Sequence, residues 1–361
     1  MSLNALLEAL SIPILQAPMV GASGVALCAA VSEAGGLGAL AAGAMAPEDI
    51  GPAVAAVRAA SAGPFCVNLL MAPAAAPEPG EVAAALARLT PFYARLGMTT
   101  PETPNSFAPD FEAQLDAVIA ARPAGASFTF GVLTPARVAQ LHAAGILVIG
   151  TATTVAEALA WADVGADGVC AQGFEAGGHR GHFLAEAEAS LVGTMALVST
   201  IRAALDLPLI AAGGIMDGRS VAAALALGAD AVQMGTAFLL ADEAVTPAPW
   251  RQAVEATAPD STRLTRAYTG RQARGMETEF MRRLRPVEDE VPAYPVQNRL
   301  TQPMRAAAAA CGESDLMSLW AGQGVSLVSS GRAGDLMRRW WQEAADASDA
   351  LARRMRGRDR A

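Results

Sequence analysis

The sequence predicts an α/β fold: a parallel (β/α)8 barrel of the TIM type with an inserted lid and a second, mainly helical lobe. Short apolar runs that end in glycine or polar residues alternate with alanine-rich segments of helical length, which is the pattern of parallel strands buried on both faces. The segment Gly165–Val169 is echoed by Gly228–Val232, as expected of a fold built from repeated units. The length of 361 residues suits one barrel of about 250 residues and an appended lobe.

The predicted strands follow one another with room for a helix after most of them. Eight such runs in one chain favour a closed barrel over an open doubly wound sheet. The eight runs are residues 12–17, 37–42, 65–70, 127–132, 147–151, 168–172, 209–212 and 231–235.

The strand pattern also predicts the domain organisation. The barrel is expected to span residues 1–241, with a Pro- and Ala-rich insertion at about 71–109 that forms a lid over the barrel mouth. The strand pattern is lost from residue 242 onward, so residues 242–328 are expected to form a helical substrate lobe. Residues 329–361 contain an amphipathic pattern, and we expect one C-terminal helix that packs back on the barrel.

The charged residues exclude several classes of function. The formal net charge of −9 provides no cationic surface for nucleic acid, so a small-molecule partner is expected. All 26 cationic residues are arginine. Without lysine the chain has neither a Schiff-base nucleophile nor the ammonium group of a phosphate-binding loop, and a guanidinium group cannot replace them because it stays protonated.

The cysteines and the uncharged segments indicate a cytoplasmic protein. The four cysteines are widely spaced and include no Cys-x-x-Cys pair, which argues against zinc and against a redox dithiol. The longest uncharged stretch, between Glu8 and Glu33, is interrupted by proline, glutamine and several glycines, so it is not expected to span a membrane.

The residues that follow the predicted strands form the predicted site, because the active site of such a barrel lies at the carboxyl ends of its strands. Gly213 and Gly214 follow the seventh strand, and Gly235 ends the eighth. Bare backbone can approach an anion closely, and the N–H groups at a following helix N-terminus point at it, so these glycines predict a phosphate site. The alternative is that they only form tight turns.

Two amides and one histidine complete the predicted site. Asn68 and Gln172 interrupt otherwise apolar strands and can donate and accept hydrogen bonds, as the edge of a flavin ring requires; the alternative is a pair of satisfied core amides. His179 follows Gly177 and Gly178, where a neutral imidazole could act as a general base. His182 completes an H-x-x-H pattern, but no further metal ligand lies near it in the sequence, so no metal is expected.

Several long segments resemble the class I nitronate monooxygenases, formerly called 2-nitropropane dioxygenases. They are PILQAPMVGASG at 13–24, VSEAGGLGAL at 31–40, CAQGFEAGGHRGHF at 170–183, AAGGIMDGRSVAAALALGADAVQMGTAFL at 211–239, GRQARG at 270–275 and SLWAGQG at 318–324. The resemblance implies oxidation of alkyl nitronates, such as propionate 3-nitronate, with dioxygen to a carbonyl compound and nitrite. For its assembly, a homodimer is one possibility.

The resemblance also implies a cofactor and the residues around it. The cofactor is non-covalent FMN, and His179 takes the catalytic position. The implied cofactor-binding residues are Ala17, Pro18, Met19, Asn68, Gln172, Gly177, Gly178, Gly213, Gly214, Gln233, Met234, Gly235 and Thr236.

The second lobe is expected to supply the residues that bind a substrate carboxylate. Because the chain has no lysine, the cation that balances an anionic substrate must be an arginine or a helix N-terminus. Tyr268, Arg271, Tyr294 and Arg299 are the candidates for this rim, and the alternative is that they form surface or interlobe pairs.

Two other functions compete with the monooxygenase. An FMN-dependent enoyl-acyl-carrier-protein reductase has similar glycine–histidine and AAGGI motifs but uses NAD(P)H, and rapid flavin reduction by NADPH would identify it. The other alternative is a non-catalytic flavin-binding protein with a degenerate site. Replacement of His179 by asparagine distinguishes this alternative, because only an enzyme would lose turnover while keeping its flavin.

Overall fold

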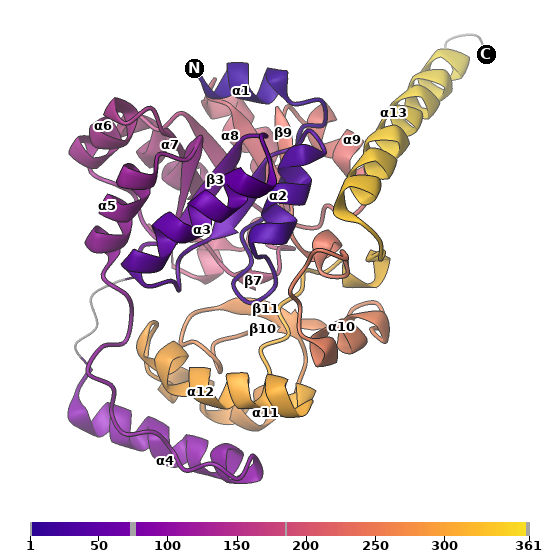
Figure 1. The fold of residues 1–361 in the computed structure, drawn as a ribbon. Coiled ribbons are helices and arrows are strands. Elements are labelled where there is room, and N and C mark those ends of the chain that lie inside the picture. Colours follow the sequence, from indigo (N-terminus) through magenta and orange to yellow (C-terminus); the bar gives the residue numbers. More distant parts are fainter. Residues whose placement is uncertain (1, 73–76, 185, 359–361) are drawn as a thin grey trace.

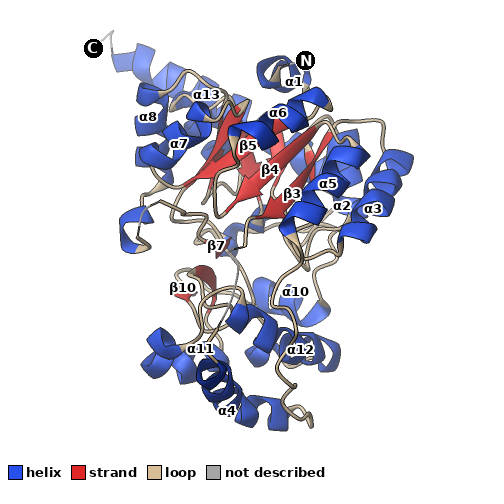
Figure 2. Ribbon diagram, turned by 90° about the vertical axis from the view of Figure 1, so that its left-hand side faces the viewer, coloured by secondary structure: helices blue, strands red, loops and turns tan. Residues whose placement is uncertain are grey.

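The computed structural model describes residues 2–72, 77–184 and 186–358, and its core is a closed parallel barrel (Figures 1 and 2). Eight parallel strands are hydrogen-bonded in the order β1-β9-β8-β6-β5-β4-β3-β2. The ring closes where the amide of Gln16 donates to the carbonyl of Leu37 at 3.0 Å. The strands are β1 Ile14–Gln16, β2 Gly38–Ala41, β3 Phe65–Leu70, β4 Gly125–Thr129, β5 Leu147–Ala152, β6 Gly168–Gln172, β8 Leu209–Ala212 and β9 Ala231–Met234. The predicted fold class is confirmed.

One strand differs clearly from its predicted bounds. The sequence predicts a strand over residues 127–132, whereas β4 covers Gly125–Thr129. The reason is Phe130, whose φ of 82° places it in the left-handed region, so that the extended conformation cannot continue. The backbone turns here, and the Phe130 side chain reaches the cavity described below.

Helices cover the outside of the barrel and close its amino end. Alternate strand residues such as Val67 and Val148 pack outward against the surrounding helices, which explains why the strands are apolar on both faces. Inside the barrel, Leu3 and Leu6 of α1 (Leu3–Ala9) pack against Leu147 and other inward-facing residues. The covering helices are α2 Val25–Glu33, α3 Pro47–Ala60, α5 Phe111–Ala121, α6 Pro135–Ala143, α7 Val155–Asp163, α8 Thr194–Ala204 and α9 Gly218–Ala226.

A second lobe with its own hydrophobic core lies beyond the carboxyl ends of the strands (Figure 2). A small antiparallel sheet, in the order β10-β11-β7, joins it to the barrel because β7 (Gly178–His179) comes from the barrel loop after β6. The lobe is therefore not purely helical. Its other elements are α10 Ala248–Glu255, β10 Thr262–Thr265, β11 Ala273–Met276, α11 Glu279–Leu284, η3 Arg285–Glu290, α12 Val296–Cys311, η4 Ser314–Leu316 and η5 Val325–Leu327.

The predicted insertion at 71–109 contributes a helix to this second lobe. In α4 (Pro79–Arg95), the ring of Phe92 lies 4.7 Å from that of Phe280, and the hydroxyl of Tyr93 donates to the carbonyl of Leu300 at 2.7 Å. Residues 106–109, at the end of the insertion, line the cavity. Residues 73–76 lie outside the described part of the chain.

The C-terminal helix α13 (Ala333–Arg358) packs on the barrel against α9 and α2. Trp340 is 2% exposed, and its ring lies 5.1 Å from that of Phe238. Glu343 accepts a hydrogen bond from the amide of Gly218 at the start of α9. Of the helices that the structure describes, none combines the length and the apolar composition needed to cross a bilayer.

Candidate active site

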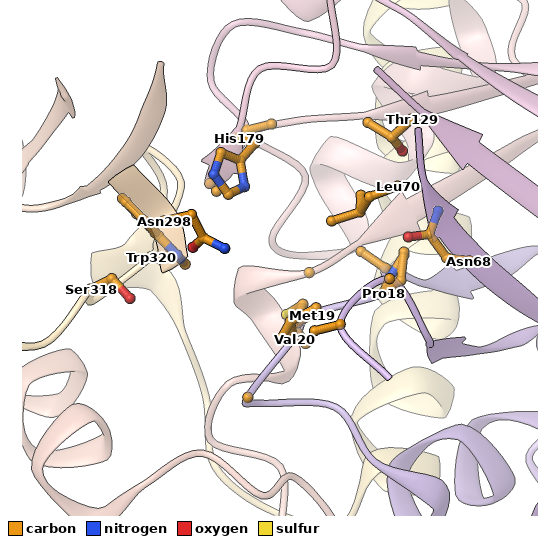
Figure 3. A pocket seen from close by; sticks show the side chains of 18 of the residues that line it. Pro18, Met19, Val20, Asn68, Leu70, Thr129, His179, Asn298, Ser318 and Trp320 are labelled. Atoms are coloured by element: carbon orange, nitrogen blue, oxygen red, sulfur yellow. The ribbon is translucent and has the colours of Figure 1, made fainter. Parts of the chain in front are cut away.

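A cavity of about 800 Å³ lies at the carboxyl ends of the strands, between the barrel and the second lobe. Figure 3 shows His179, Asn298 and Trp320 grouped on one side of it, with Asn68 and Pro18 on the other. The structure brings most of the predicted site residues to its lining: Ala17, Pro18, Met19, Asn68, Gln172, Gly177, Gly178, His179, Gly213, Gly214, Gln233, Gly235, Thr236, Tyr294 and Arg299.

Three predicted residues do not line this cavity, and the structure corrects their expected direct contacts. Met234 alternates with Gln233 along β9, so its side chain is buried in the core. Tyr268 is fully buried, and its hydroxyl hydrogen-bonds with that of Thr278 at 2.7 Å. Arg271 lies behind Phe130, with its guanidinium carbon 4.2 Å from the centre of the ring. These three side chains therefore pack outside the cavity and do not form its wall.

Asn68 presents a hydrogen-bond acceptor to the cavity. Its Nδ2 donates to the carbonyl and the hydroxyl of Ser127, at 3.2 and 3.0 Å. Because the amide nitrogen is occupied in this way, the orientation of the side chain is determined and Oδ1 is left to accept. From the sequence alone, Asn68 could present either a donor or an acceptor. The hydrogen bonds to Ser127 on the neighbouring strand β4 determine that it presents an acceptor.

Gln172 presents a hydrogen-bond donor. Its Oε1 accepts from Nη1 of Arg180 at 3.0 Å and from the amide of Gly181 at 2.8 Å, while Nε2 donates one hydrogen to the carbonyl of His179 at 3.0 Å. The second hydrogen on Nε2 is available to a ligand. Arg180 is fully buried, and burial lowers its pKa to about 10. Together, an acceptor on β3 and a donor on β6 suit a ring whose edge carries both N–H and C=O groups.

The glycines after the last two strands form a close-fitting backbone wall. Gly213 and Gly214 have φ values of 106° and 72°, which side chains rarely adopt. A Cβ atom on Gly177 would lie 2.6 Å from the backbone nitrogen of Gly322, so this part of the SLWAGQG segment meets the barrel loop without side chains between them. The amide of Gly322 also donates to the hydroxyl of Thr236 at 2.9 Å.

The structure corrects one part of the predicted phosphate site. Asp217 caps the N-terminus of α9, the helix that follows β8, and its carboxylate accepts from the amide of Ser220 at 2.9 Å. With Glu343 also at this end, the N-terminus of α9 already holds two carboxylates and does not suit an anion. The remaining candidates for anion binding are the backbone groups near Gly214 and the short helix η2 (Thr236–Phe238) that follows β9.

His179 is held at the edge of the cavity by contacts from both lobes. In β7 it pairs with Ala273 of β11, and its Nε2 lies 3.0 Å from the hydroxyl of Thr269. The rings of Phe130, Tyr294 and Trp320 surround the imidazole with centroid distances of 5.5, 5.6 and 5.8 Å. Burial first, and then the charges of Arg271 and Arg305, lower the pKa of His179 to about 3. The imidazole is therefore neutral at physiological pH.

Two partly buried guanidinium groups make the surroundings of His179 positive. Burial lowers the pKa values of Arg271 and Arg305 to about 10, so both remain charged at neutral pH. Within the described residues neither forms an ion pair with a carboxylate. Arg305 lines the cavity and donates instead to Ser318 at 3.3 Å and to Asn298 at 2.7 Å. A protein of net charge −9 thus keeps unpaired positive charge at this site.

Sequence reasoning gave no site role to several residues that line the cavity. Phe130 lies inside the predicted strand 127–132, whereas Asn298, Arg305, Ser318 and Trp320 belong to the second lobe. The SLWAGQG motif was the available signal for Ser318 and Trp320. The others carry no local pattern that separates them from ordinary helix or loop residues. In the described part of the chain, no group of three or more His, Cys, Asp or Glu side chains could hold a metal ion.

A closed parallel barrel with a neutral imidazole and complementary amides around a deep cavity has the fold and site of a flavin-dependent oxidoreductase. The residues fit such a cofactor because they provide an acceptor, a donor and a glycine-lined wall. The family model described as nitronate monooxygenase matches residues 4–343. The chain therefore belongs to the nitronate monooxygenase family, which confirms the resemblance found in its sequence.

Individual relatives agree with this assignment. A nitronate monooxygenase from Pseudomonas aeruginosa is 42% identical over 330 residues, which cover 90% of this chain and 94% of the relative. A probable nitronate monooxygenase from Staphylococcus aureus is 37% identical over 337 residues, covering 92% and 95%. Among solved structures, nitroalkane oxidase from Streptomyces ansochromogenes has a TM-score of 0.89 and 40% identity, covering 96% of this chain and 99% of its own. FabK from Thermotoga maritima has a TM-score of 0.75 and 28% identity, covering 96% and 98%.

Proposed function

We propose that the protein is an FMN-dependent nitronate monooxygenase that converts alkyl nitronates and dioxygen into a carbonyl compound and nitrite. The observation that carries this proposal is the neutral imidazole of His179, flanked by the guanidinium groups of Arg271 and Arg305, neither of which is paired with a carboxylate within the described residues. A nitronate is an anion, and a partly buried positive site attracts and orients an anion. Propionate 3-nitronate carries a second negative group, and Arg305 or Arg299 at the cavity wall is suited to it.

The cavity residues divide into a cofactor set and a substrate set. Asn68 and Gln172 would hold the polar edge of the FMN ring, and backbone groups near Gly214, Gly235 and Thr236 would hold its phosphate. When bound, the flavin would supply the redox chemistry between the nitronate and dioxygen. The protein supplies binding, orientation and charge.

The role of His179 depends on the protonation state of the substrate. With a preformed nitronate, no base is needed, and the anion would be bound by the positive charge at the cavity wall, such as that of Arg305. With a neutral nitroalkane, a base must first remove the α-proton, and His179 lines the cavity in a position to do so. The rings of Phe130, Tyr294 and Trp320 pack around the imidazole and would limit the access of water to it. The similarity to the Streptomyces nitroalkane oxidase supports including neutral nitroalkanes among the substrates.

The competing reductase has weaker support. The FabK structure matches with 28% identity and a TM-score of 0.75, against 40% and 0.89 for the nitroalkane oxidase. Stopped-flow mixing of the flavin-loaded protein with NADPH tests this alternative directly. Slow or absent bleaching of the flavin is expected, and rapid bleaching without any nitronate would favour the reductase.

The decisive experiment measures the cofactor and the substrate on the same sample. Purified protein should bind FMN, show a flavin absorption spectrum, and take up oxygen with propionate 3-nitronate faster than with the matching neutral nitro compound. In His179→Asn, we expect turnover of neutral nitroalkanes to fall by about 100-fold or more while FMN binding changes little. Protein that stays colourless after incubation with FMN would contradict the proposal, and flavin-loaded protein without nitronate turnover would indicate a binding protein.

A further inference from the structure

Thr269 is a buried threonine whose side chain contacts the imidazole of His179. It is 1% exposed and lies in the turn between β10 and β11, far from His179 in the sequence. Its Oγ1 lies 3.0 Å from Nε2 of His179, 3.1 Å from the carbonyl oxygen of Arg271 and 3.4 Å from the amide nitrogen of Arg271. One hydroxyl group therefore has three hydrogen-bonding neighbours but only one proton to donate.

The chemistry of these neighbours decides where that proton goes. The carbonyl of Arg271 can only accept, and the amide of Arg271 can only donate. The arrangement that satisfies all groups has the hydroxyl of Thr269 donating to the carbonyl and accepting from both the amide and Nε2 of His179. The reverse arrangement, with the hydroxyl donating to Nε2, would leave the carbonyl of Arg271 without this donor, which is unfavourable in a buried turn.

A neutral imidazole carries one ring hydrogen, so a hydrogen on Nε2 leaves a lone pair on Nδ1. The surroundings of the ring favour this orientation, because three aromatic rings pack around the imidazole and the hydroxyl of Thr269 lies at Nε2. Nδ1 of His179 has no hydrogen bond to any residue in the described ranges, and His179 itself lines the cavity.

We propose that Thr269 is a positioning residue that keeps His179 as the Nε2–H tautomer, so that Nδ1 is the proton acceptor for neutral nitroalkanes. This inference rests on the proposed function and deepens it by naming the nitrogen of His179 that accepts the α-proton and the residue that determines this choice. In the step, the α C–H bond of the nitroalkane breaks and its electron pair forms the C=N bond of the nitronate. The proton moves to Nδ1, and the negative charge moves to the nitro oxygens, beside Arg305.

Nuclear magnetic resonance of protein labelled with ¹⁵N-histidine tests the tautomer without any activity. The chain has only three histidines, and the signals lost in His179→Asn identify those of His179. At neutral pH we expect Nε2 of His179 to be protonated and Nδ1 to be unprotonated in the wild type and in Thr269→Ser, which keeps the hydroxyl. Thr269→Val, which removes it, should show a mixture of tautomers. A wild-type spectrum with the hydrogen on Nδ1 would overturn the proposal, even if the valine variant failed to fold.

The second test compares the turnover of a neutral nitroalkane with that of its matching nitronate. Thr269→Val should lower turnover of a neutral nitroalkane by about 10-fold or more relative to its matching nitronate, because only the nitroalkane needs the base. Thr269→Ser should restore the ratio, and Thr257→Val, which removes a half-buried hydroxyl outside this cavity, should not change it. Equal losses on both substrates in Thr269→Val would refute a positioning role. If the wild type failed to oxidise any nitronate, the proposed function would fail, while the spectrum would still report the tautomer.

Discussion

Arg305 donates to the side-chain oxygen of Asn298 at 2.7 Å, and this hydrogen bond determines which end of the Asn298 amide is free. With Oδ1 occupied, Nδ2 remains available as a donor at the wall of the cavity. Figure 3 shows Asn298 beside His179 and Trp320. The second lobe thus contributes a donor group backed by a positive charge, as an anionic substrate requires.

The first prediction concerns this pair. Asn298→Asp replaces the free donor with a carboxylate that neutralises Arg305, so the KM for an anionic nitronate should rise by about 10-fold or more, because a hydrogen bond to a charged group contributes about 1.5–3 kcal/mol. Steady-state oxygen uptake measures this effect. Gln252→Glu is the control for added negative charge, since Gln252 is exposed on α10 and does not line the cavity. An equal effect of both changes would indicate a general charge effect in place of a specific contact.

The second prediction concerns the dependence of stability on pH. The folded-state pKa of His179, about 3, lies below its ordinary value of 6.5, so between these values the unfolded chain binds a proton that the folded protein excludes. The contribution of His179 to the unfolding free energy is therefore complete only above pH 6.5. Below that pH, the unfolding free energy falls by about 1.4 kcal/mol per pH unit because of this group. Between pH 7.5 and 5, the unfolding free energy of the wild type should fall by about 2 kcal/mol more than that of His179→Asn.

Urea unfolding at the two pH values measures this difference. His182, whose pKa is lowered to about 4 by burial and by Arg271, acts in the same direction but is present in both proteins, so its contribution cancels. Parallel losses of stability in the two proteins would show that His179 is protonated as easily in the folded state as in the unfolded chain.

A third prediction follows from the contact between Gly177 and Gly322. A Cβ atom on Gly177 would lie 2.6 Å from backbone atoms of Ala321 and Gly322, so Gly177→Ala must move the second lobe away from the cavity. We expect a loss of about 1–3 kcal/mol in stability and weaker FMN binding by fluorescence titration. Gly51→Ala is the control, because Gly51 lies in α3 and a Cβ there meets nothing within 4 Å. It should be neutral or slightly stabilising. Tight FMN binding by Gly177→Ala would show that the wall tolerates a methyl group.

The fourth prediction concerns the C-terminal helix. Trp340→Ala removes a side chain that is 2% exposed and packs on Phe238, which should cost about 3–5 kcal/mol in unfolding free energy. Leu351→Ala lies further along α13, where the side chain is 54% exposed, and should change stability by less than about 0.5 kcal/mol. Thermal or urea denaturation compares the two variants. Equal losses of unfolding free energy in the two variants would mean that Trp340 does not stabilise the packing of α13 on the barrel.

The features that could be predicted from the sequence are those that depend on short local patterns of residues. The apolar runs indicated all eight barrel strands, because burial on both faces of a parallel sheet requires consecutive apolar residues. The one clear shift, at β4, came from the left-handed conformation of Phe130, which no composition rule predicts for phenylalanine. Gly177, Gly214 and His179 were selected because strand ends meet at one face of a barrel, and the structure places them at one cavity.

The contacts within the cavity that could not be predicted are those between residues that lie far apart in the sequence. The pairing of β7 with β11 brings Thr269 to His179, and the packing of α12 brings Asn298 and Arg305 to the same wall. Tyr268 and Arg271 do not line the cavity for the same reason, since their side chains are directed by packing around the second lobe. None of these relationships leaves a periodic pattern in the chain.

The amino-acid sequence by itself determined the barrel, the family and the ring of glycines and amides at the strand ends, because each follows from residue type and spacing along one segment. Only the tertiary structure decided which atoms of those groups face a ligand. The amide of Asn68, the amide of Gln172 and the imidazole of His179 can each present either a donor or an acceptor. The choice is made by hydrogen bonds with Ser127, Arg180 and Thr269, which folding places beside them.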